Sequence, residues 1–198
     1  LTVTATDGVA TSAGVIVVVD VNDVNDTAPV VGAAGPFGVA EDALNTAAVG
    51  AVVATDADGV GAVTGYNITA GDSGGAFAID ASGQITVADT AAIDYETATS
   101  FNLTITATDG VNTSAGVVVV VDVSDVNDTA PVVGAAGPFS VAEDAVNTTV
   151  VGSVSATDAD TVGAVTNYNF SSGNIGGAFA ISATGDITVA NTAVIDFE

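Results

Sequence analysis

The chain has 198 residues and carries 24 Asp and Glu residues but no Lys, Arg or His, which gives a formal net charge of −24. With no basic side chain to meet phosphate, binding to nucleic acid or to an anionic membrane surface is not expected. Cys is absent as well, so Ser–His and Cys–His pairs, Schiff-base lysines and the usual zinc and copper sites are excluded. The chemistry that remains is that of carboxylate, amide, hydroxyl and carbonyl oxygens.

The sequence repeats itself with a period of 102 residues, and 73 of the 96 aligned pairs are identical. A repeat of this length is a whole domain, so tandem domains are predicted. Two periods exceed the chain by six residues, so that Leu1 corresponds to Leu103 and Glu198 to Glu96. Two interpretations are open: the chain is a window of a longer periodic polymer, or residues 1–22 of one subunit complete the last domain of the next.

The predicted elements are β-strands from one end of the chain to the other. The runs Val15–Val19 and Val117–Val121 are expected to be strands covered on both faces, and both are too short to span a bilayer. Residues 76–79 and 85–87 flank a glycine-containing turn, which predicts a hairpin. In residues 100–106 apolar and polar side chains alternate, which indicates a half-buried strand. About seven short strands per hundred residues predict an all-β, two-sheet sandwich.

The acidic residues gather at the ends of predicted strands. The clusters are Asp20–Asp26, Glu41–Asp42, Asp56–Asp58 and Asp94–Glu96, with Asp7 and Asp109 standing alone. Strand ends converge at the two poles of a sandwich, where like charges repel by roughly several kcal/mol unless a cation lies between them. A hard divalent ion with about 6–8 oxygen ligands fits this chemistry, which predicts calcium.

A second group of acids is expected to serve solubility. These acids are replaced by neutral residues in the second repeat: Asp72, Asp80 and Asp89 become Asn174, Ser182 and Asn191.

Five motifs resemble those of cadherin repeats, in the order in which that family has them. Residues 23–29 and 125–131 both read Asp-Val-Asn-Asp-Thr-Ala-Pro, similar to the DxNDNAP linker. Glu41 resembles the first-strand glutamate, and residues 56–58 resemble the DxD motif. Residues 93–96 resemble the LDRE motif and residues 107–110 the AxDxG strand. The ordered set occurs twice and covers the whole chain.

The resemblance implies tandem seven-stranded Greek-key β-sandwiches joined by calcium-binding linkers. The expected segments are residues 1–22 (the last strands of a preceding domain), 23–27 (linker), 28–124 (complete domain), 125–129 (linker) and 130–198 (first part of a following domain). Up to three Ca²⁺ ions are expected at each junction between domains.

The resemblance also assigns ligands to each junction. The junction after the complete domain takes Glu41, Asp94, Glu96, Asp125, Asn127, Asp128, Asp158 and Asp160, with the carbonyls of Val126 and Thr129. The junction before it takes Asp23, Asn25, Asp26, Asp56, Asp58 and Asp109. The remaining motif acids, expected to be metal ligands as well, are Asp7, Glu143, Asp196 and Glu198. Two departures from the family pattern are the threonines at 27 and 129 and the aromatic residues at 95 and 197.

These residues lead to the hypothesis of a non-enzymatic, calcium-stiffened extracellular array that forms a filament or the stalk of an adhesin. The alternative is a cell-adhesion module that binds glycans or a second cadherin. Expected partners are neighbouring repeats of the same or identical chains, with lateral bundling as an option, and no membrane insertion is expected in this segment. Asn67 and Asn169 are candidate glycan sites, because the same sequon occurs in both repeats.

Overall fold

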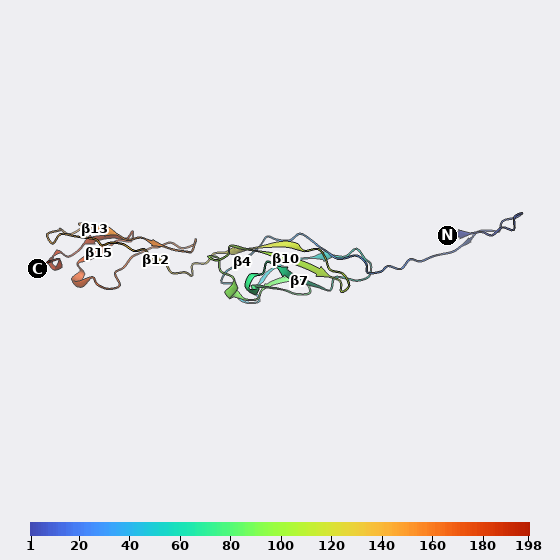
Figure 1. Ribbon diagram of the computed structural model, residues 1–198, viewed down its shortest axis with the longest axis horizontal. Helices are drawn as coiled ribbons and strands as arrows, with labels where there is room; N and C mark the ends of the chain where they lie inside the picture. The colour runs from blue at the N-terminus through green and yellow to red at the C-terminus, as the bar shows by residue number, and fades with distance from the viewer. The chain divides into compact units, whose positions relative to one another are not determined.

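The computed structural model describes residues 1–198 and confirms the all-β class (Figure 1). The only helical segments are four 3₁₀ turns, η1 (Ser73–Gly75), η2 (Thr90–Ala92), η3 (Ile175–Gly177) and η4 (Thr192–Val194). None of the helical segments is long and apolar enough to cross a membrane. The strands are β1 (Thr2–Val3), β2 (Val15–Ile16), β3 (Val30–Val31), β4 (Phe37–Ala40), β5 (Ala48–Ala51), β6 (Ala54–Thr55), β7 (Gly65–Ala70), β8 (Phe77–Ile79), β9 (Gln84–Val87), β10 (Ser100–Thr108), β11 (Val117–Ser124), β12 (Val132–Val133), β13 (Val150–Ser153), β14 (Ala156–Thr157), β15 (Phe179–Ile181) and β16 (Asp186–Val189).

The chain divides into two compact units. One holds residues 1–38, 44–92 and 100–122, and the other holds residues 39–43, 93–99 and 123–198. The second unit thus takes the Glu41 and Asp94–Glu96 loops together with the linker that follows β11. Each junction of acidic residues described below lies inside one unit.

Residues 28–124 form a two-sheet sandwich. One sheet has the strand order β4-β11-β10-β7 and the other the order β5-β9-β8, with a short β3-β6 pair beside them. All printed pairings are antiparallel, including the predicted hairpin β8–β9, in which Phe77 lies opposite Val87. Nine strands are present instead of seven, because two of the expected strands are interrupted: β3 and β4 are separated at Gly35–Pro36, and β5 and β6 at Val52–Val53.

The core of the sandwich lies between the two sheets. In β10 every second side chain is buried, including Leu103 and Ile105, as the alternation predicts. Opposite them on β11, Val119 and Val121 are buried to the same degree. Phe77 from the second sheet meets Phe101 edge-to-face, with ring centroids 5.1 Å apart. Two strands of one sheet and one of the other therefore build the apolar centre.

The prediction that the valine runs are covered on both faces is wrong. In β11 the valines alternate between the core and solvent, and Val118 is 57% exposed. The reason is that an antiparallel sheet of a two-layer sandwich has only one covered face, so a continuous apolar run does not imply two. Val15–Val19 contains only the two-residue strand β2, and all five side chains are exposed.

Residues 130–198 repeat only part of the sandwich. The sheet β13-β16-β15 and the pair β12-β14 reproduce the β5-β9-β8 sheet and the β3-β6 pair, with equivalent registers. Residues 139–142 and 167–172, which align with β4 and β7, form no strand. At the start of the chain, β1 and β2 pair as a short exposed hairpin, with Thr2 opposite Ile16. The domain boundaries given above remain a prediction.

Candidate metal centre

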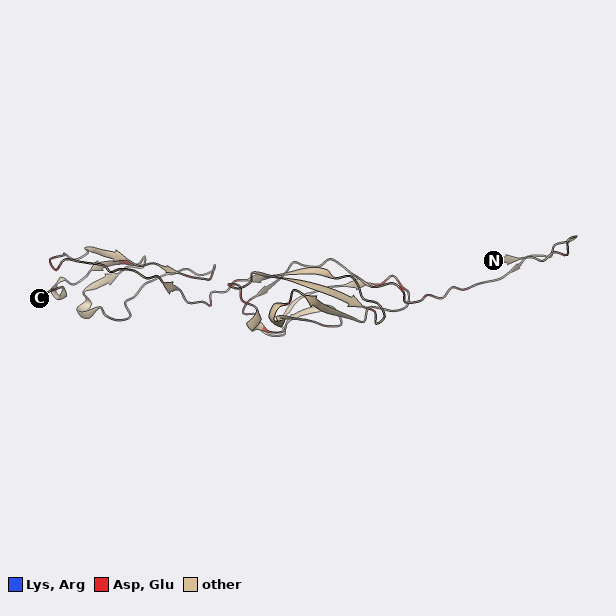
Figure 2. Ribbon diagram, viewed as in Figure 1, with Lys and Arg blue, Asp and Glu red and all other residues tan.

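Acidic side chains are concentrated in the loops and linkers, and no basic residue lies among them (Figure 2). Glu41 follows β4, Asp94 and Glu96 lie between η2 and β10, and Asp125 follows β11. Antiparallel order brings the end of β4, the end of β11 and the loop before β10 to the same pole of the sheet. This placement explains why acids 85 residues apart in sequence can meet.

Glu41 holds two of these loops together. Its side chain is buried, at 5% exposure, and both carboxylate oxygens accept backbone hydrogen bonds. The Val126 N–H donates to Oε1 at 2.6 Å, and the Tyr95 N–H donates to Oε2 at 2.7 Å. The carboxylate therefore fixes the linker and the 94–96 loop around one point.

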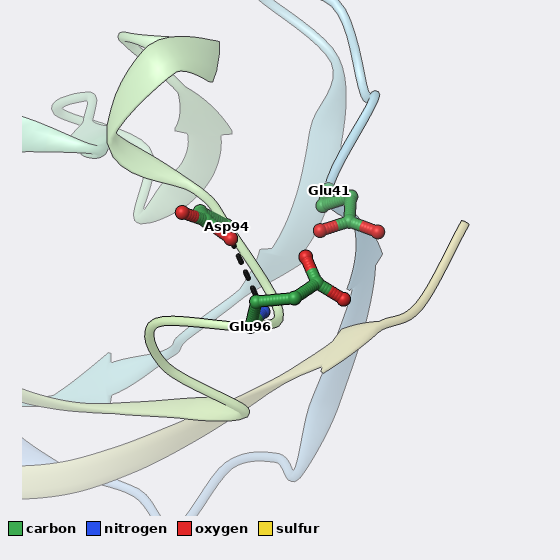
Figure 3. Close-up of side chains that lie close together, drawn as sticks. All are labelled: Glu41, Asp94 and Glu96. Carbon is green, nitrogen blue, oxygen red and sulfur yellow. Dashed lines mark hydrogen bonds between the residues drawn. The ribbon is translucent and has the colours of Figure 1, made fainter. Parts of the chain in front are cut away.

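Glu41, Asp94 and Glu96 form the first group of carboxylates, with one oxygen from each within 4.8 Å of the others. In Figure 3 the carboxylates of Glu41 and Glu96 face each other, while the Glu96 N–H donates to Asp94 Oδ1 at 3.1 Å. Loss of solvent around Glu96, with the negative charges of Glu41 and Asp160 nearby, raises the pKa of its carboxyl. The Thr97 hydroxyl, 2.7 Å from Asp94 Oδ2, lowers the pKa of Asp94.

Glu96, Asp125 and Asp160 form a second group, again with one oxygen each within 4.8 Å. Asp125 Oδ2 accepts from the backbone N–H and the hydroxyl of Thr161, and the hydroxyl contact lowers the pKa of Asp125. Asp160 Oδ2 accepts from the Thr129 N–H at 3.1 Å. Glu96 belongs to both groups, so five carboxylates form one continuous cluster.

Four buried carboxylate oxygens have no hydrogen-bond partner, and all belong to predicted ligands. They are Asp56 Oδ2, Asp125 Oδ1, Asp158 Oδ1 and Asp160 Oδ1, and no other buried side-chain nitrogen or oxygen in residues 1–198 lacks a partner. An unpaired buried carboxylate is costly, since the charge has lost water without gaining a compensating group. The chain has no cationic side chain that could pair with these oxygens. A bound cation satisfies them, so the residues present fit a metal site.

The junction before the complete domain is built in a similar way. Asp58 Oδ2 accepts from the N–H groups of Asp26 and Thr27 at 3.0 and 2.8 Å, and Asp56 Oδ1 accepts from the Asp58 N–H at 3.1 Å. Asp23 Oδ2 accepts from the Gly59 N–H. The linker is thus bound by side chains of the loop after β6, which leaves Asp56 Oδ2 free for another ligand.

Asn25 and Asn127 are each held against a glycine. Gly61 and Gly163 have φ of +83° and +81°, and a Cβ at either position would overlap the amide of the neighbouring asparagine. Both the backbone conformation and the close approach require glycine. The two linkers therefore place their asparagines in the same way.

Asp109 is buried in the turn between β10 and β11. Its Oδ1 accepts from the N–H groups of Val111 and Asn112, both at 2.7 Å. The Asn112 backbone contact is the main cause that lowers the pKa of Asp109. Asp7 makes the same turn, accepting from the N–H groups of Val9 and Ala10, and its pKa is likewise lowered by the backbone.

Two residues near these sites were missed from the sequence. The Asn112 amide lies 3.4 Å from both the Thr27 carbonyl and Asp109 Oδ2, and 3.5 Å from Asn25 Oδ1. Thr161 binds Asp125, where the first repeat has Gly59. Both differ between the repeats, so self-comparison drew attention away from them; their proximity in sequence to a motif acid was the available signal.

Other predicted ligands are not grouped. Asp128 is exposed, and its Oδ1 lies 3.4 Å from the Thr129 hydroxyl. Glu143 accepts from the Phe197 N–H at 3.3 Å, which mirrors the contact between Glu41 and Tyr95. Asp196 Oδ1 accepts from the Glu198 N–H at 3.3 Å, but these three acids make no cluster like that of Glu41, Asp94 and Glu96.

Comparison with known proteins follows from this geometry. The family model described as the cadherin domain matches residues 36–124. The chain is 30% identical to the human protocadherin-24 EC1-2 structure, with a TM-score of 0.58, and covers 83% of this chain and 78% of that one. The mouse protocadherin-24 EC1-3 structure gives a TM-score of 0.74 at 27% identity, over 96% of this chain and 65% of that one. The chain belongs to the cadherin family.

Among curated proteins, human protocadherin Fat 1 is 40% identical over 142 residues, or 67% of this chain and 3% of that protein. Protocadherin-like wing polarity protein stan of Drosophila melanogaster is 38% identical over 176 residues, or 84% of this chain and 5% of that protein. The chain spans 3–6% of the length of the curated relatives it matches. These relatives are non-enzymatic adhesion proteins of the cell surface, and the chain is an extracellular cadherin segment. Cadherin domains generally bind Ca²⁺ at the linkers between domains.

Proposed function

We propose that this chain is a structural array whose domain junctions are stiffened by bound Ca²⁺. The observation that carries the proposal is the set of four buried, unpartnered carboxylate oxygens, all at predicted ligand positions and all without a cationic side chain nearby. Calcium prefers oxygen ligands of this kind, and its charge would offset theirs.

Each side chain has a distinct task in this proposal. Glu41 positions the linker through Val126 and presents its carboxylate to the first group of acids. Glu96 connects the first group to the second. Asp125 and Asp160 each use one oxygen to hold the backbone and keep the other free for the ion. Asp158, with its own free oxygen, completes the set contributed from beyond the linker.

The consequence for the molecule is mechanical. Without the ion, the five clustered carboxylates repel, and the linker 125–129 is loosened from the loops that hold it. With the ion, residues before and after the linker share ligands, and consecutive domains act as one unit. Extracellular modules typically bind calcium with a Kd of about 10⁻⁴–10⁻³ M, which suits a filament or adhesin stalk outside the cell. At about ten times Kd, each site would add roughly 1.4 kcal/mol of stability.

Thermal unfolding and small-angle X-ray scattering of the 198-residue chain, in excess chelator and in millimolar calcium, test the proposal. Calcium should raise Tm by several degrees, at about 4–8 °C per kcal/mol for a domain of this size, and should narrow the range of interdomain distances. Asp72→Asn is the matched control, because Asn174 makes the same contacts in the second repeat, and its calcium response should equal that of the wild type. Identical melting and scattering in both buffers would refute the proposal.

A ligand-binding adhesion module is the second candidate function. It is favoured by the relatives, which are adhesion proteins, and by one solved structure described as a protocadherin gammaB7 EC3-6 cis-dimer, 28% identical with a TM-score of 0.65. Beads coated with the chain should then aggregate in calcium and disperse in chelator. Beads that stay dispersed in both buffers would leave the structural role alone.

A further inference from the structure

The sandwich formed by residues 130–198 is open on one side. It contains the equivalents of the β5-β9-β8 sheet and the β3-β6 pair, but nothing equivalent to the sheet β4-β11-β10-β7. In residues 28–124, β11 is the neighbour of β4 and β10 is the neighbour of β7. The segments 139–142 and 167–172 align with β4 and β7 and form no strand. Their missing partner is a hairpin equivalent to β10–β11.

The open side leaves apolar groups uncovered. Val133 is 59% exposed, whereas its equivalent Val31 is 5% exposed. A cavity of about 680 Å³ lies against Val141, Phe179 and Ile195, whose equivalents Val39, Phe77 and Ile93 are all buried core residues. An apolar opening of this size marks a surface that another element covers.

The chain carries a second copy of the hairpin that fits this opening. Residues 1–22 are identical to residues 103–124 at 18 of 22 positions. The registers agree as well, with Thr2 opposite Ile16 where Thr104 lies opposite Val118.

The apolar face of this hairpin is exposed. Leu1 and Val19 are 80% and 64% exposed, whereas Leu103 and Val121 are fully buried in the core of the complete sandwich. Two surfaces with no partner, one on the hairpin and one on residues 130–198, thus correspond to the two halves of an interface that residues 28–124 contain in full.

We propose that the 1–22 hairpin of a second copy of this chain inserts into the open sandwich 130–198, between segments 139–142 and 167–172. Strand addition satisfies the unpaired backbone groups of both segments, and the apolar face of the hairpin fills the cavity. The register of the complete sandwich, in which Thr106 lies opposite Asn67, places Thr4 of the donor opposite Asn169 of the acceptor.

The donor is a second copy because of where the linkers attach. Linker 125–129 meets the sandwich 130–198 at the pole of Asp160. In the complete domain, the strand equivalent to β2 leads into the linker at the opposite pole, beside Glu41. An inserted hairpin would therefore continue into its own residues 28–124 beyond the far pole, and a single sandwich cannot adjoin both poles. Contact of this head-to-tail kind does not close on itself and builds open chains of subunits.

Insertion also completes the ligand sets. Glu143, Asp196 and Glu198 of the acceptor would meet Asp23 and the rest of the 23–27 linker of the donor, as Glu41 and its neighbours meet the 125–129 linker within one chain. This last step rests on the proposed calcium function. The insertion itself is apolar packing and strand pairing, and it should occur in chelator as well.

Sedimentation velocity of the 198-residue chain over a range of concentrations, in chelator and in calcium, tests the insertion. Oligomers in steps of 18.9 kDa are expected in both buffers. Val19→Asp should weaken association at least tenfold, because Val121 is buried at the equivalent position. Ile16→Asp is the matched control and should associate like the wild type, because the equivalent Val118 faces solvent. A chain that is monomeric at every concentration, or equal weakening by both substitutions, overturns the proposal.

The register gives a second, independent measurement, since the chain has no native cysteine. Thr4→Cys combined with Asn169→Cys should give a ladder of disulfide-linked multimers on a non-reducing gel. Thr4→Cys combined with Asn167→Cys is offset by two residues and should give little. Equal ladders from both pairs would contradict the insertion. Association without any calcium response would retain the insertion and refute the calcium function, and a calcium response without association would do the reverse.

Discussion

Acidic residues of this chain fall into two kinds, which are separated by what their neutral counterparts do. Asp72 Oδ1 accepts from the Phe77 N–H at 3.2 Å, and Asn174 Oδ1 accepts from the Phe179 N–H at 2.9 Å. Asp80 caps the β8–β9 turn as a hydrogen-bond acceptor, and Ser182 accepts from the backbone of the equivalent turn. Such acids act as turn acceptors, for which charge is dispensable. Asp56, Asp125 and their partners instead keep an oxygen with no acceptor role in the turn.

Asp80 gives a prediction for acid pH. Hydrogen bonds, first of all from the Ser82 hydroxyl, lower the pKa of Asp80 from its ordinary value of 3.8, so folding favours the ionised form. Its stabilising contribution is therefore present above pH 3.8 and is lost as the pH falls through the lowered value. Asp80→Ser keeps the acceptor and removes the titration. The difference in Tm between wild type and variant, followed from pH 6 to about pH 2, should shrink on acidification; a constant difference would contradict this account.

Asp160→Asn should change stability in opposite directions in the two buffers. In chelator the substitution removes an unpaired buried charge and keeps the acceptor for the Thr129 N–H, so it should stabilise by about 1–3 kcal/mol. In calcium it removes a ligand oxygen and should weaken calcium binding at least about tenfold, or about 1.4 kcal/mol. Paired thermal melts measure both effects. Destabilisation of similar size in both buffers would mean that Asp160 has only a structural role.

Strand formation in this protein depends on the partner as much as on the sequence. Phe37–Ala40 forms β4 beside β11, while the aligned residues 139–142 differ at one position and form no strand. Local propensity is nearly equal in the two segments, so the neighbouring hairpin decides the outcome. The same dependence explains why the 1–22 hairpin pairs only at β1 and β2, whereas β10 and β11 pair over six positions.

The repeat supplies a matched pair of substitutions at this scale. Leu103→Ala should lower the free energy of unfolding of the complete sandwich by about 2–5 kcal/mol, because Leu103 is fully buried. Leu1→Ala makes the same change at the aligned, exposed position and should leave that unfolding transition within about 0.5 kcal/mol. Urea denaturation at low protein concentration separates the two. Equal losses would show that the core of residues 28–124 is not the one described.

Much of the element pattern could be predicted from the sequence. The alternation at Phe101–Ile105 and the turn at Ala81–Gly83 depend on local rules, and both were confirmed. The double coverage of Val117–Val121 was wrong, because a run of valines does not report how many layers lie around a sheet. Motif spacing indicated Glu41, Glu96 and Asp125 as a group, whereas Asn112 depends on a side-chain contact across the turn that no single-residue pattern encodes.

Over the whole molecule, a charge of −24 without any basic side chain makes self-repulsion a general cost. Monovalent salt screens exposed charges with a Debye length of about 10 Å at 0.1 M and about 3 Å at 1 M. Raising NaCl from 0.1 to 1 M in chelator should therefore raise Tm, and the rise should be smaller in saturating calcium, where the junction charges are already offset. Calorimetric scans in the four conditions measure this. Equal salt effects with and without calcium would place the repulsion elsewhere than at the junctions.

The most direct measurement is a crystal structure of the chain grown in millimolar calcium, with anomalous scattering used to locate the ions. The account predicts ion density within about 2.3–2.6 Å of the unpartnered oxygens of Asp125, Asp158 and Asp160, with Glu96 completing the ligand set. Clear side-chain density at this junction with no ion between the carboxylates would contradict the central claim.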